Sequence, residues 1–401
     1  MDAPAELTSA QPQLPPLIRL FLCGDVMIGR GIDQVLAHPC NPVLHEDYAH
    51  SATDYVHLAE AANGPIPRRV DPSYVWGTAL DELSRALPDG RIVNLETSVT
   101  RSDDYVPKGI NYRASPENAN CLAAAAIDCC VLANNHVLDW GRAGLSETLA
   151  TLAHLRIKTA GAGRNLDEAA APAVLDFHPK GRVLIFSFAS PTSGVFRSWA
   201  ATRESPGVNF LSDLSLATIA DITKQAARLR RPGDVIVVSI HWGSNWGYQI
   251  PDAQRRFAHA LIDHAGVSIV HGHSSHHAKG IEVYRNRLIL YGCGDFLNDY
   301  EGISGHEEYR DDLALMYFAD INAQSADLVG LEMVPLQIRN FRLIRPSRPD
   351  VDWLQQTLDR ESRGLGARIM PGADGRLALS WPTERRGRGT AQGKPYGGEG
   401  C

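Results

Sequence analysis

Short apolar runs alternate with amphipathic stretches through the first two thirds of the chain. The runs typical of buried strands are residues 18–23, 91–95, 128–131, 182–188, 234–240 and 267–270. The stretches with the apolar spacing or the start and stop signals of helices are residues 78–87, 116–126, 144–155, 213–230 and 252–265. This alternation predicts an α/β fold with parallel strands.

The pattern changes after Gly280, where strands follow one another with few helices between them. These predicted strands are residues 281–284, 287–291, 313–318 and 328–334, and a last helix is predicted over 352–362. Residues 38–76 show no clear period and are interpreted as an insertion or long loop. The predicted division is a flexible leader (1–16), one main domain (17–345), a C-terminal helix and extension (346–384) and a disordered tail (385–401).

Composition excludes several classes of protein. The 401 residues carry a formal net charge of −7, which argues against a nucleic-acid partner. The N-terminus lacks a signal-peptide pattern and the apolar runs are too short for a bilayer, so we expect no intrinsic membrane span and a cytoplasmic location. The seven cysteines have no metal-type spacing, and Cys129 and Cys130 lie inside a predicted strand, which favours reduced, buried thiols.

Side chains that can bind metals follow several of the predicted strands. They are Asp25, Glu96, Asn135 with His136, His241, and His273 with His276. Because the carboxyl ends of parallel strands meet at one edge of a sheet, these groups can converge although they are far apart in the sequence. Mixed carboxylate, amide and imidazole ligands suit a divalent metal such as Mn, Zn, Fe, Mg or Ca, as one or two ions.

Each of these residues also has a purely structural explanation. Asn134 and Asn135 could cap the following helix, and Asp25 could be a turn residue after Gly24. His241, beside Trp242, could be a packed core residue, and Glu96 and His276 could cap a segment or lie in solvent. Five such clusters, each just after a strand, together favour a site.

The motifs in this order resemble those of CapA-type proteins, the poly-γ-glutamate capsule biosynthesis branch of the calcineurin-like metallophosphoesterases. They read GDVMIGR at 24–30, NLET at 94–97, NYRA at 111–114, ANNH at 133–136 with Asp139, HWG at 241–243 and GHSSH at 272–276. The resemblance spans residues 18–334 and is particularly close to the mycobacterial-type polyglutamine-synthesis accessory proteins. It implies an α/β/β/α sandwich of the metallophosphatase type, with a metal site at the sheet edge.

The resemblance also implies a role for each site residue. Asp25 and His276 would bind a first metal, Glu96 would bridge, and Asn135, His241 and His273 would bind a second. His136 would be the catalytic acid, with Asp139 orienting an imidazole. The remaining candidates for supporting or substrate contacts are Asn134, Arg30, Arg113, Trp242 and Asp295.

Two positions depart from the family pattern. Met27 stands where the superfamily has a metal-binding His, and a thioether is a poor ligand for a hard cation, so we expect a weak or absent first metal. Ser275 stands where the family usually has Pro. The chain also lacks the membrane anchor of many capsule members, which leads us to expect a substrate inside the cell.

Three functions remain open at this point. The first is metal-assisted hydrolysis, with a phosphoester or related bond as substrate and His136 as proton donor. The second is epimerisation at a peptide α-carbon, with Asp25 and His306 as the acid/base pair. The third is a non-catalytic accessory role in assembling a glutamate or glutamine polymer, with recruitment by a membrane synthase complex. The corresponding partners are a small molecule, a peptide or a glutamate polymer.

Overall fold

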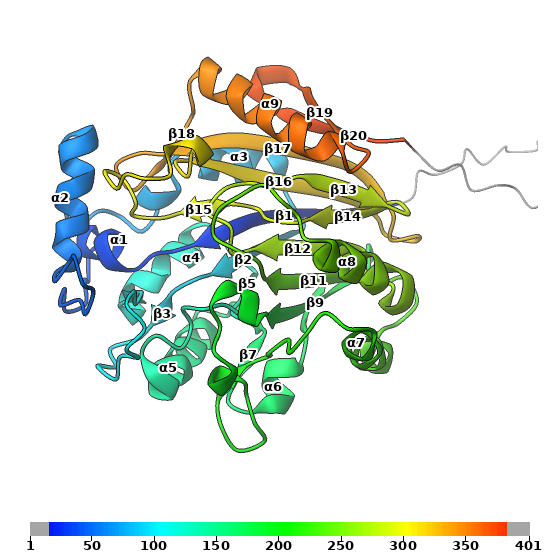
Figure 1. The fold of residues 1–401 in the computed structure, drawn as a ribbon, viewed down its shortest axis with the longest axis horizontal. Helices are drawn as coiled ribbons and strands as arrows, with labels where there is room; N and C mark the ends of the chain where they lie inside the picture. Colours follow the sequence, from blue (N-terminus) through cyan, green and yellow to red (C-terminus); the bar gives the residue numbers. More distant parts are fainter. Residues whose placement is uncertain (1–15, 383–401) are drawn as a thin grey trace, which may run out of the picture.

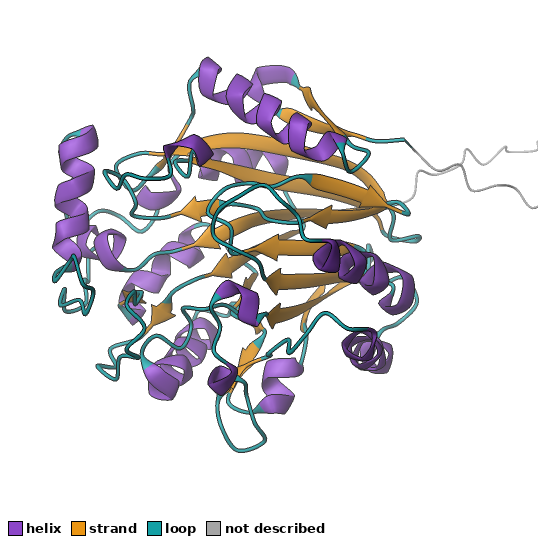
Figure 2. Cartoon of the chain, in the orientation of Figure 1, coloured by secondary structure: helices purple, strands orange, loops and turns teal. Residues whose placement is uncertain are grey.

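The computed structural model describes residues 16–382 (Figure 1). The predicted disordered tail and all but the last residue of the predicted leader therefore lie outside the described residues. Two large β-sheets form the centre of the structure, with helices around them (Figure 2).

The ten-stranded sheet, here called the large sheet, has the order β19-β20-β17-β16-β1-β2-β5-β6. Its parallel half consists of β1 (Leu17–Val26), β2 (Gly90–Leu95), β5 (Cys129–Val131) and β6 (Lys158–Ala160). Its antiparallel half consists of β16 (Leu313–Asn322), β17 (Leu328–Ile338), β20 (Leu377–Ser380) and β19 (Arg368–Pro371). Two further strands join it: β15 (Asp295–Leu297) beside β1 and β18 (Leu343–Ile344) beside β17.

The six-stranded sheet, here called the small sheet, has the order β13-β14-β12-β11-β9-β8. These strands are β13 (Ile281–Tyr284), β14 (Arg287–Leu290), β12 (Ile269–His273), β11 (Val235–His241), β9 (Arg182–Ala189) and β8 (Ala173–Asp176). Two short pairs lie outside both sheets: β3 (Ser98–Val99) with β4 (Arg113–Ala114), and β7 (Ala162–Gly163) with β10 (Gly207–Val208).

Helices cover the outer faces of the sheets. The α-helices are α1 (Arg30–Val35), α2 (Ala52–Asn63), α3 (Ala79–Ala86), α4 (Asn120–Ala124), α5 (Gly141–His154), α6 (Leu166–Ala170), α7 (Leu216–Leu229), α8 (Asp252–Ala265) and α9 (Arg348–Arg363). The 3-10 helices are η1 (Tyr74–Trp76), η2 (Pro116–Ala119), η3 (Pro191–Ser193), η4 (Arg197–Trp199), η5 (Glu307–Tyr309) and η6 (Ala373–Gly375). Between residues 16 and 382, no helix combines the length and apolarity that crossing a membrane requires.

Side-chain alternation along the strands creates three apolar layers. In β1, Ile18, Leu20 and Leu22 point into the core between the two sheets, whereas Phe21 and Cys23 point to the helices behind the large sheet. In β11, the even-numbered residues from Ile236 to Ile240 pack with α7 and α8 on the far side of the small sheet. This arrangement is the predicted α/β/β/α sandwich, so the predicted fold class is confirmed.

One predicted segment is partly wrong. Residues 38–76, interpreted as an insertion or long loop, are not a simple loop, because they contain α2 and η1. Ser51 and Asp54 form a capping box at the start of α2, and the buried residues of the helix are Ala52, Tyr55, Val56 and Ala59. So few buried apolar positions leave a weak periodic signal in the sequence. In Figure 1 this helix stands at one end of the molecule beside α1.

The C-terminal extension is part of the large sheet. Strand β20 pairs with β17 in antiparallel register, and β19 pairs with β20. Helix α9 lies against β19 and contacts β13 of the small sheet (Figure 1). The extension therefore contacts both sheets of the sandwich.

Candidate metal centre

The carboxyl ends of strands from both sheets bring the predicted ligands together. Asp25 lies at the end of β1, and Glu96 directly follows β2. His241 and His273 are the last residues of β11 and β12 and stand opposite each other in parallel register. Asn135 follows β5. This is the edge at which open α/β sheets bind ligands.

Three of these side chains form a compact, buried cluster. Asp25, His241 and His273 each offer a ligating atom, and all three atoms lie within 4.8 Å of one another. The Nδ1 atoms of His241 and His273 are 2.7 Å apart, and Nδ1 of His273 is 3.8 Å from Oδ1 of Asp25. On its other side, Nε2 of His241 lies 2.9 Å from Oδ1 of Asn135 and 3.5 Å from Oε1 of Glu96. Five predicted ligands are therefore adjacent.

A buried hydrogen-bond relay behind the cluster determines the tautomer of His273. Nε2 of His271 lies 2.7 Å from the carbonyl oxygen of Cys23, which can only accept, so this nitrogen carries the hydrogen. Burial lowers the pKa of His271 to about 4, so the ring is neutral and its Nδ1 accepts from the Ser239 hydroxyl at 3.1 Å. Oγ of Ser239 then accepts the Nε2 hydrogen of His273 at 2.8 Å. Nδ1 of His273 is left with a lone pair facing the cluster.

The charges and lone pairs of the cluster fit a cation. If Nε2 of His241 donates to Asn135, the Nδ1 atoms of His241 and His273 present lone pairs to each other, and a shared cation stabilises that arrangement. Burial, together with the nearby Asp295, raises the pKa of Asp25 to about 7. Burial and Asp25 also raise the pKa of Glu96. A divalent ion would relieve this carboxylate repulsion, so the cluster could hold one.

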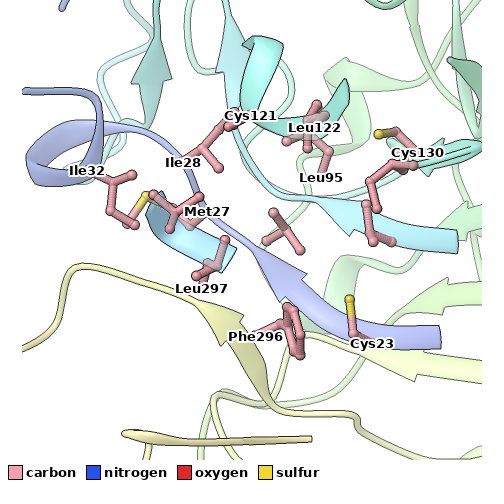
Figure 3. Close-up of a cluster of buried hydrophobic side chains, with 14 of the residues drawn as sticks. Cys23, Met27, Ile28, Ile32, Leu95, Cys121, Leu122, Cys130, Phe296 and Leu297 are labelled. Carbon is pink, nitrogen blue, oxygen red and sulfur yellow. The ribbon is translucent and has the colours of Figure 1, made fainter. Parts of the chain in front are cut away.

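The position predicted for a first metal is incomplete. Met27 is 2% exposed and belongs to the apolar core, where Figure 3 shows it close to Ile32 and Leu297. Its sulfur accepts a hydrogen bond from the backbone N–H of Gly29 at 3.1 Å. His276, the other first-metal candidate, has its Nδ1 3.0 Å from Oδ1 of Asp295, a carboxylate that also accepts from Asn298. The well-formed ligand set is therefore the one around His241.

His136 is held between a carboxylate and an aromatic ring. Its Nδ1 lies 2.6 Å from Oδ2 of Asp139, and its ring stacks on Tyr112 with centroids 3.8 Å apart. Nε2 lies 3.9 Å from Oε1 of Glu96, on the side of the cluster. The Lys108 ammonium lies 2.8 Å from Oδ1 of Asp139. Burial and this ammonium lower the pKa of His136, so the resting imidazole is neutral and can accept a proton.

Asn134 supports the turn that carries these groups. Its side-chain amide donates to Oδ1 of Asn94 at 3.1 Å and to the carbonyl of Leu95 at 2.8 Å. Its Oδ1 accepts from the backbone N–H groups of His136 and Val137. Asn94 in turn donates to Asp25 at 2.7 Å. Asn134 thus positions the backbone of the turn, whereas the side chain of Asn135 faces the cluster.

Two neighbouring cavities open at this edge of the sheets. The metal chamber, of about 370 Å³, is lined among others by Glu96, Lys108, Asn135, His136 and Phe196. The side chamber, of about 250 Å³, is lined among others by Tyr48, Trp246, Ile303, His306 and Asp311. The two share the lining residues Ile110, Tyr112, His276 and Tyr300.

The other predicted site residues lie outside the metal chamber. His306 stacks on Trp246 at 4.0 Å in the side chamber, and no contact joins it to Asp25 within residues 16–382. Arg30 is buried in ion pairs with Asp299 and Glu46 and lines the side chamber. Arg113 lies over the Trp140 ring and binds backbone carbonyls at Ser102 and Asn41. Trp242 belongs to the apolar core with Phe257.

Three site residues escaped the sequence reasoning. Lys108 lies in an irregular Pro- and Gly-containing loop, far in sequence from its partner Asp139. Ser239 is hidden within the apolar run of β11, and only its alternation with Val237 and His241 marks its direction. His271 directly precedes the Gly-His motif, and this proximity was its available signal.

Comparison with known proteins gives a consistent set of matches. The family model described as bacterial capsule synthesis protein PGA_cap matches residues 19–300. A probable polyglutamine synthesis accessory protein of Mycobacterium tuberculosis is 45% identical over 367 residues, covering 91% of this chain and 96% of that protein. The PGA biosynthesis protein CapA of Bacillus subtilis is 28% identical over 338 residues, covering 83% and 75%. The capsule biosynthesis protein CapA of Bacillus anthracis is 27% identical over 334 residues, covering 80% and 68%.

Proposed function

The chain belongs to the bacterial capsule synthesis protein family, and from this premise we propose that it is a metal-dependent hydrolase serving the biosynthesis of a glutamate or glutamine polymer. The choice of a glutamate or glutamine polymer rests on the names of the relatives. Hydrolase activity is supported mainly by one observation, the buried cluster of Asp25, His241 and His273. Asn135 and Glu96 lie beside this cluster. The substrate bond is a phosphoester or a related bond.

The residues at the site would hold one ion rather than two. His241, His273, Asn135 and a carboxylate from Asp25 or Glu96 would bind it, since these donors are adjacent and suit a divalent cation. Bound there, the ion would polarise the substrate and lower the pKa of a coordinated water. Met27 lies in the core and does not supply the ligand expected from it at the neighbouring position.

His136 accepts and returns the proton in this proposal. Because Asp139 lies against its Nδ1, that nitrogen carries the hydrogen and Nε2 presents a lone pair toward Glu96 and the chamber. Its lowered pKa keeps it in the neutral form that can take a proton from water. Lys108 compensates the Asp139 charge and adds a cation to the chamber wall, where an anionic substrate group would lie.

Metal content and hydrolysis, measured together, test the proposal. Purified protein supplied with Mn or Zn should hydrolyse bis(p-nitrophenyl) phosphate or p-nitrophenyl phosphate. His136→Asn should lower kcat by about 10²–10⁴-fold while metal content is unchanged. His264→Asn, an exposed histidine on α8, is the matched control and should retain wild-type activity.

A non-catalytic accessory role is the second candidate, and the incomplete first-metal position favours it. In that case metal-loaded protein would hydrolyse neither substrate above the rate of the His136→Asn variant. It would nevertheless bind its synthase or polymer, and His241→Ala would leave this binding intact. Hydrolysis lost in both His136→Asn and His241→Ala would exclude the accessory role.

A further inference from the structure

The side chamber has a different chemistry from the metal chamber. It adjoins the metal chamber along Tyr112 and Tyr300, whose hydroxyl oxygens lie 2.6 Å apart. Its volume of about 250 Å³ exceeds the roughly 30 Å³ of a water molecule severalfold, so a group of several heavy atoms fits. A substrate bound at the metal chamber can therefore extend into it.

The positive charges that line the side chamber are already neutralised. The Arg30 guanidinium is buried and contacts the carboxylates of both Asp299 and Glu46. The His276 imidazole lies against Asp295. The single positive charge of Arg30 is therefore balanced by two carboxylates, and the His276 imidazole is paired with the Asp295 carboxylate.

A carboxylate on the same wall has no such partner. Within the described residues, no other side chain donates a hydrogen bond to the Asp311 carboxylate or forms an ion pair with it, although most of the residue is buried. Burial and the nearby Asp295 and Asp312 raise its pKa to about 7, and this outweighs the His276 imidazole, which lowers it without forming an ion pair with it. Glu307 adds a second carboxylate to the lining and accepts from the backbone N–H of Gly305 and from its own backbone N–H.

Most of the remaining lining is apolar or aromatic. Trp246 and Ile110 line the chamber, and Tyr48 and Ile303 lie at its rim with 66% and 46% of their surface exposed. Walls of this kind can pack against the methylene groups of a ligand. An ammonium group at the end of such a ligand has three hydrogen-bond donors, and each of them needs an acceptor. The unpaired carboxylates and the tyrosine hydroxyls supply these acceptors.

We propose that the side chamber binds a primary ammonium group carried on an aliphatic stem, with Asp311 as its counter-ion. For the proposed hydrolase this assigns an amine-bearing substrate, whose anionic part lies near Lys108 and the metal ligands, and to that extent it rests on the proposed function. The same carboxylates repel a side chain that ends in a free carboxylate. A peptide end or a diamino acid fits the pair of chambers, whereas an unbroken run of glutamate carboxylates does not.

Three five-carbon probes of equal length test the ammonium site. The binding of pentylamine, pentanol and pentanoate to the full-length protein is measured by saturation-transfer NMR titration. Pentylamine should bind on the order of tenfold more tightly than pentanol, with pentanoate weakest. Asp311→Asn should reduce the preference for the amine to about twofold or less. Glu308→Gln removes a neighbouring exposed carboxylate that does not line the chamber, and should retain the preference.

The result is independent of catalysis. His241→Ala should bind pentylamine as the wild type does, so a failure of the hydrolase proposal leaves this measurement informative. Equal binding of amine and alcohol, preferred binding of pentanoate, absence of amine binding, or an unchanged preference in Asp311→Asn would each overturn the ammonium site.

Discussion

The ends of β11 and β12 differ from the end of β1 although all three strands reach the same site. On the small sheet, His241 and His273 are fully buried, aligned in register, and supported by the relay through Ser239. On the large sheet, β1 supplies Asp25, but Met27 turns into the apolar core (Figure 3). The ends of β11 and β12 thus supply two histidines, supported by a buried hydrogen-bond relay, whereas the end of β1 contributes a single carboxylate. The difference is the basis for the proposed one-ion centre, in which the small sheet supplies most of the support.

Loss of His241 should have the largest effect. Its two ring nitrogens face the two sides of the ligand set, His273 on one and Asn135 on the other. His241→Ala should reduce bound Mn or Zn from about one ion per chain to a small fraction, measured by elemental analysis after gel filtration. His264→Ala should retain the ion. Two ions per wild-type chain would contradict the one-ion centre.

Loss of the hydrogen-bond relay behind His273 should have the next largest effect on metal binding. Ser239→Ala removes the hydroxyl that orients His273, and we expect metal affinity to fall about 10- to 100-fold. Ser187 is the matched control because it stands beside Ser239 in the register of β9 and β11, is equally buried, and its hydroxyl has no partner within the described residues. Ser187→Ala should leave the affinity unchanged. Equal losses in both variants would assign the effect to packing.

Parallel strand ends explain why much of this centre could be predicted from sequence. Asp25, Glu96, Asn135, His241 and His273 each follow an apolar run, and this topology brings such positions together. Sequence also indicated a weak first metal, from the residue type of Met27. It could not reveal the direction of that side chain, since the backbone changes course directly after β1.

The supporting residues were harder to predict for a different reason. The contact between Lys108 and Asp139 depends on the path of an irregular loop, which no periodicity describes. Ser239 and His271 lie in strands whose apolar character conceals single polar side chains. The side chamber combines Tyr48, Trp246 and Asp311 from three separate loops, so its existence follows only from tertiary structure.

Substitution at Met27 sharpens the comparison of the two strand ends. Met27→His introduces the residue type that the resemblance implies at this position, but places an imidazole in the apolar core beside Ile32 and Leu297. We expect a loss of about 1–3 kcal/mol in the free energy of unfolding and no second ion. Met27→Leu should cost less than about 1.5 kcal/mol. Denaturant titration and elemental analysis measure both, and a second ion in Met27→His would show that the side chain can face the site.

Protonation of Asp25 should give the smallest and most graded effect. Its pKa is raised from 3.8 to about 7 by burial and by Asp295, and only the deprotonated carboxylate binds metal. Metal affinity should therefore fall as the pH is lowered through about 7, whereas the pKa of His273 is lowered, so that histidine remains neutral.

The raised pKa of Asp25 has the opposite effect on the stability of metal-free protein. Because the folded pKa of Asp25 exceeds the unfolded one, its contribution to stability is fully present below about 3.8 and is lost as the pH rises through about 7. Added Mn or Zn should therefore raise Tm more at pH 8 than at pH 5.5. Asp25→Asn should remove most of this difference, and Asp252→Asn, an exposed carboxylate at the start of α8, should not. Equal metal-induced shifts in Tm at both pH values would show that the ion is held by the histidines without Asp25, and the ligand set would then belong to the small sheet and Asn135 alone.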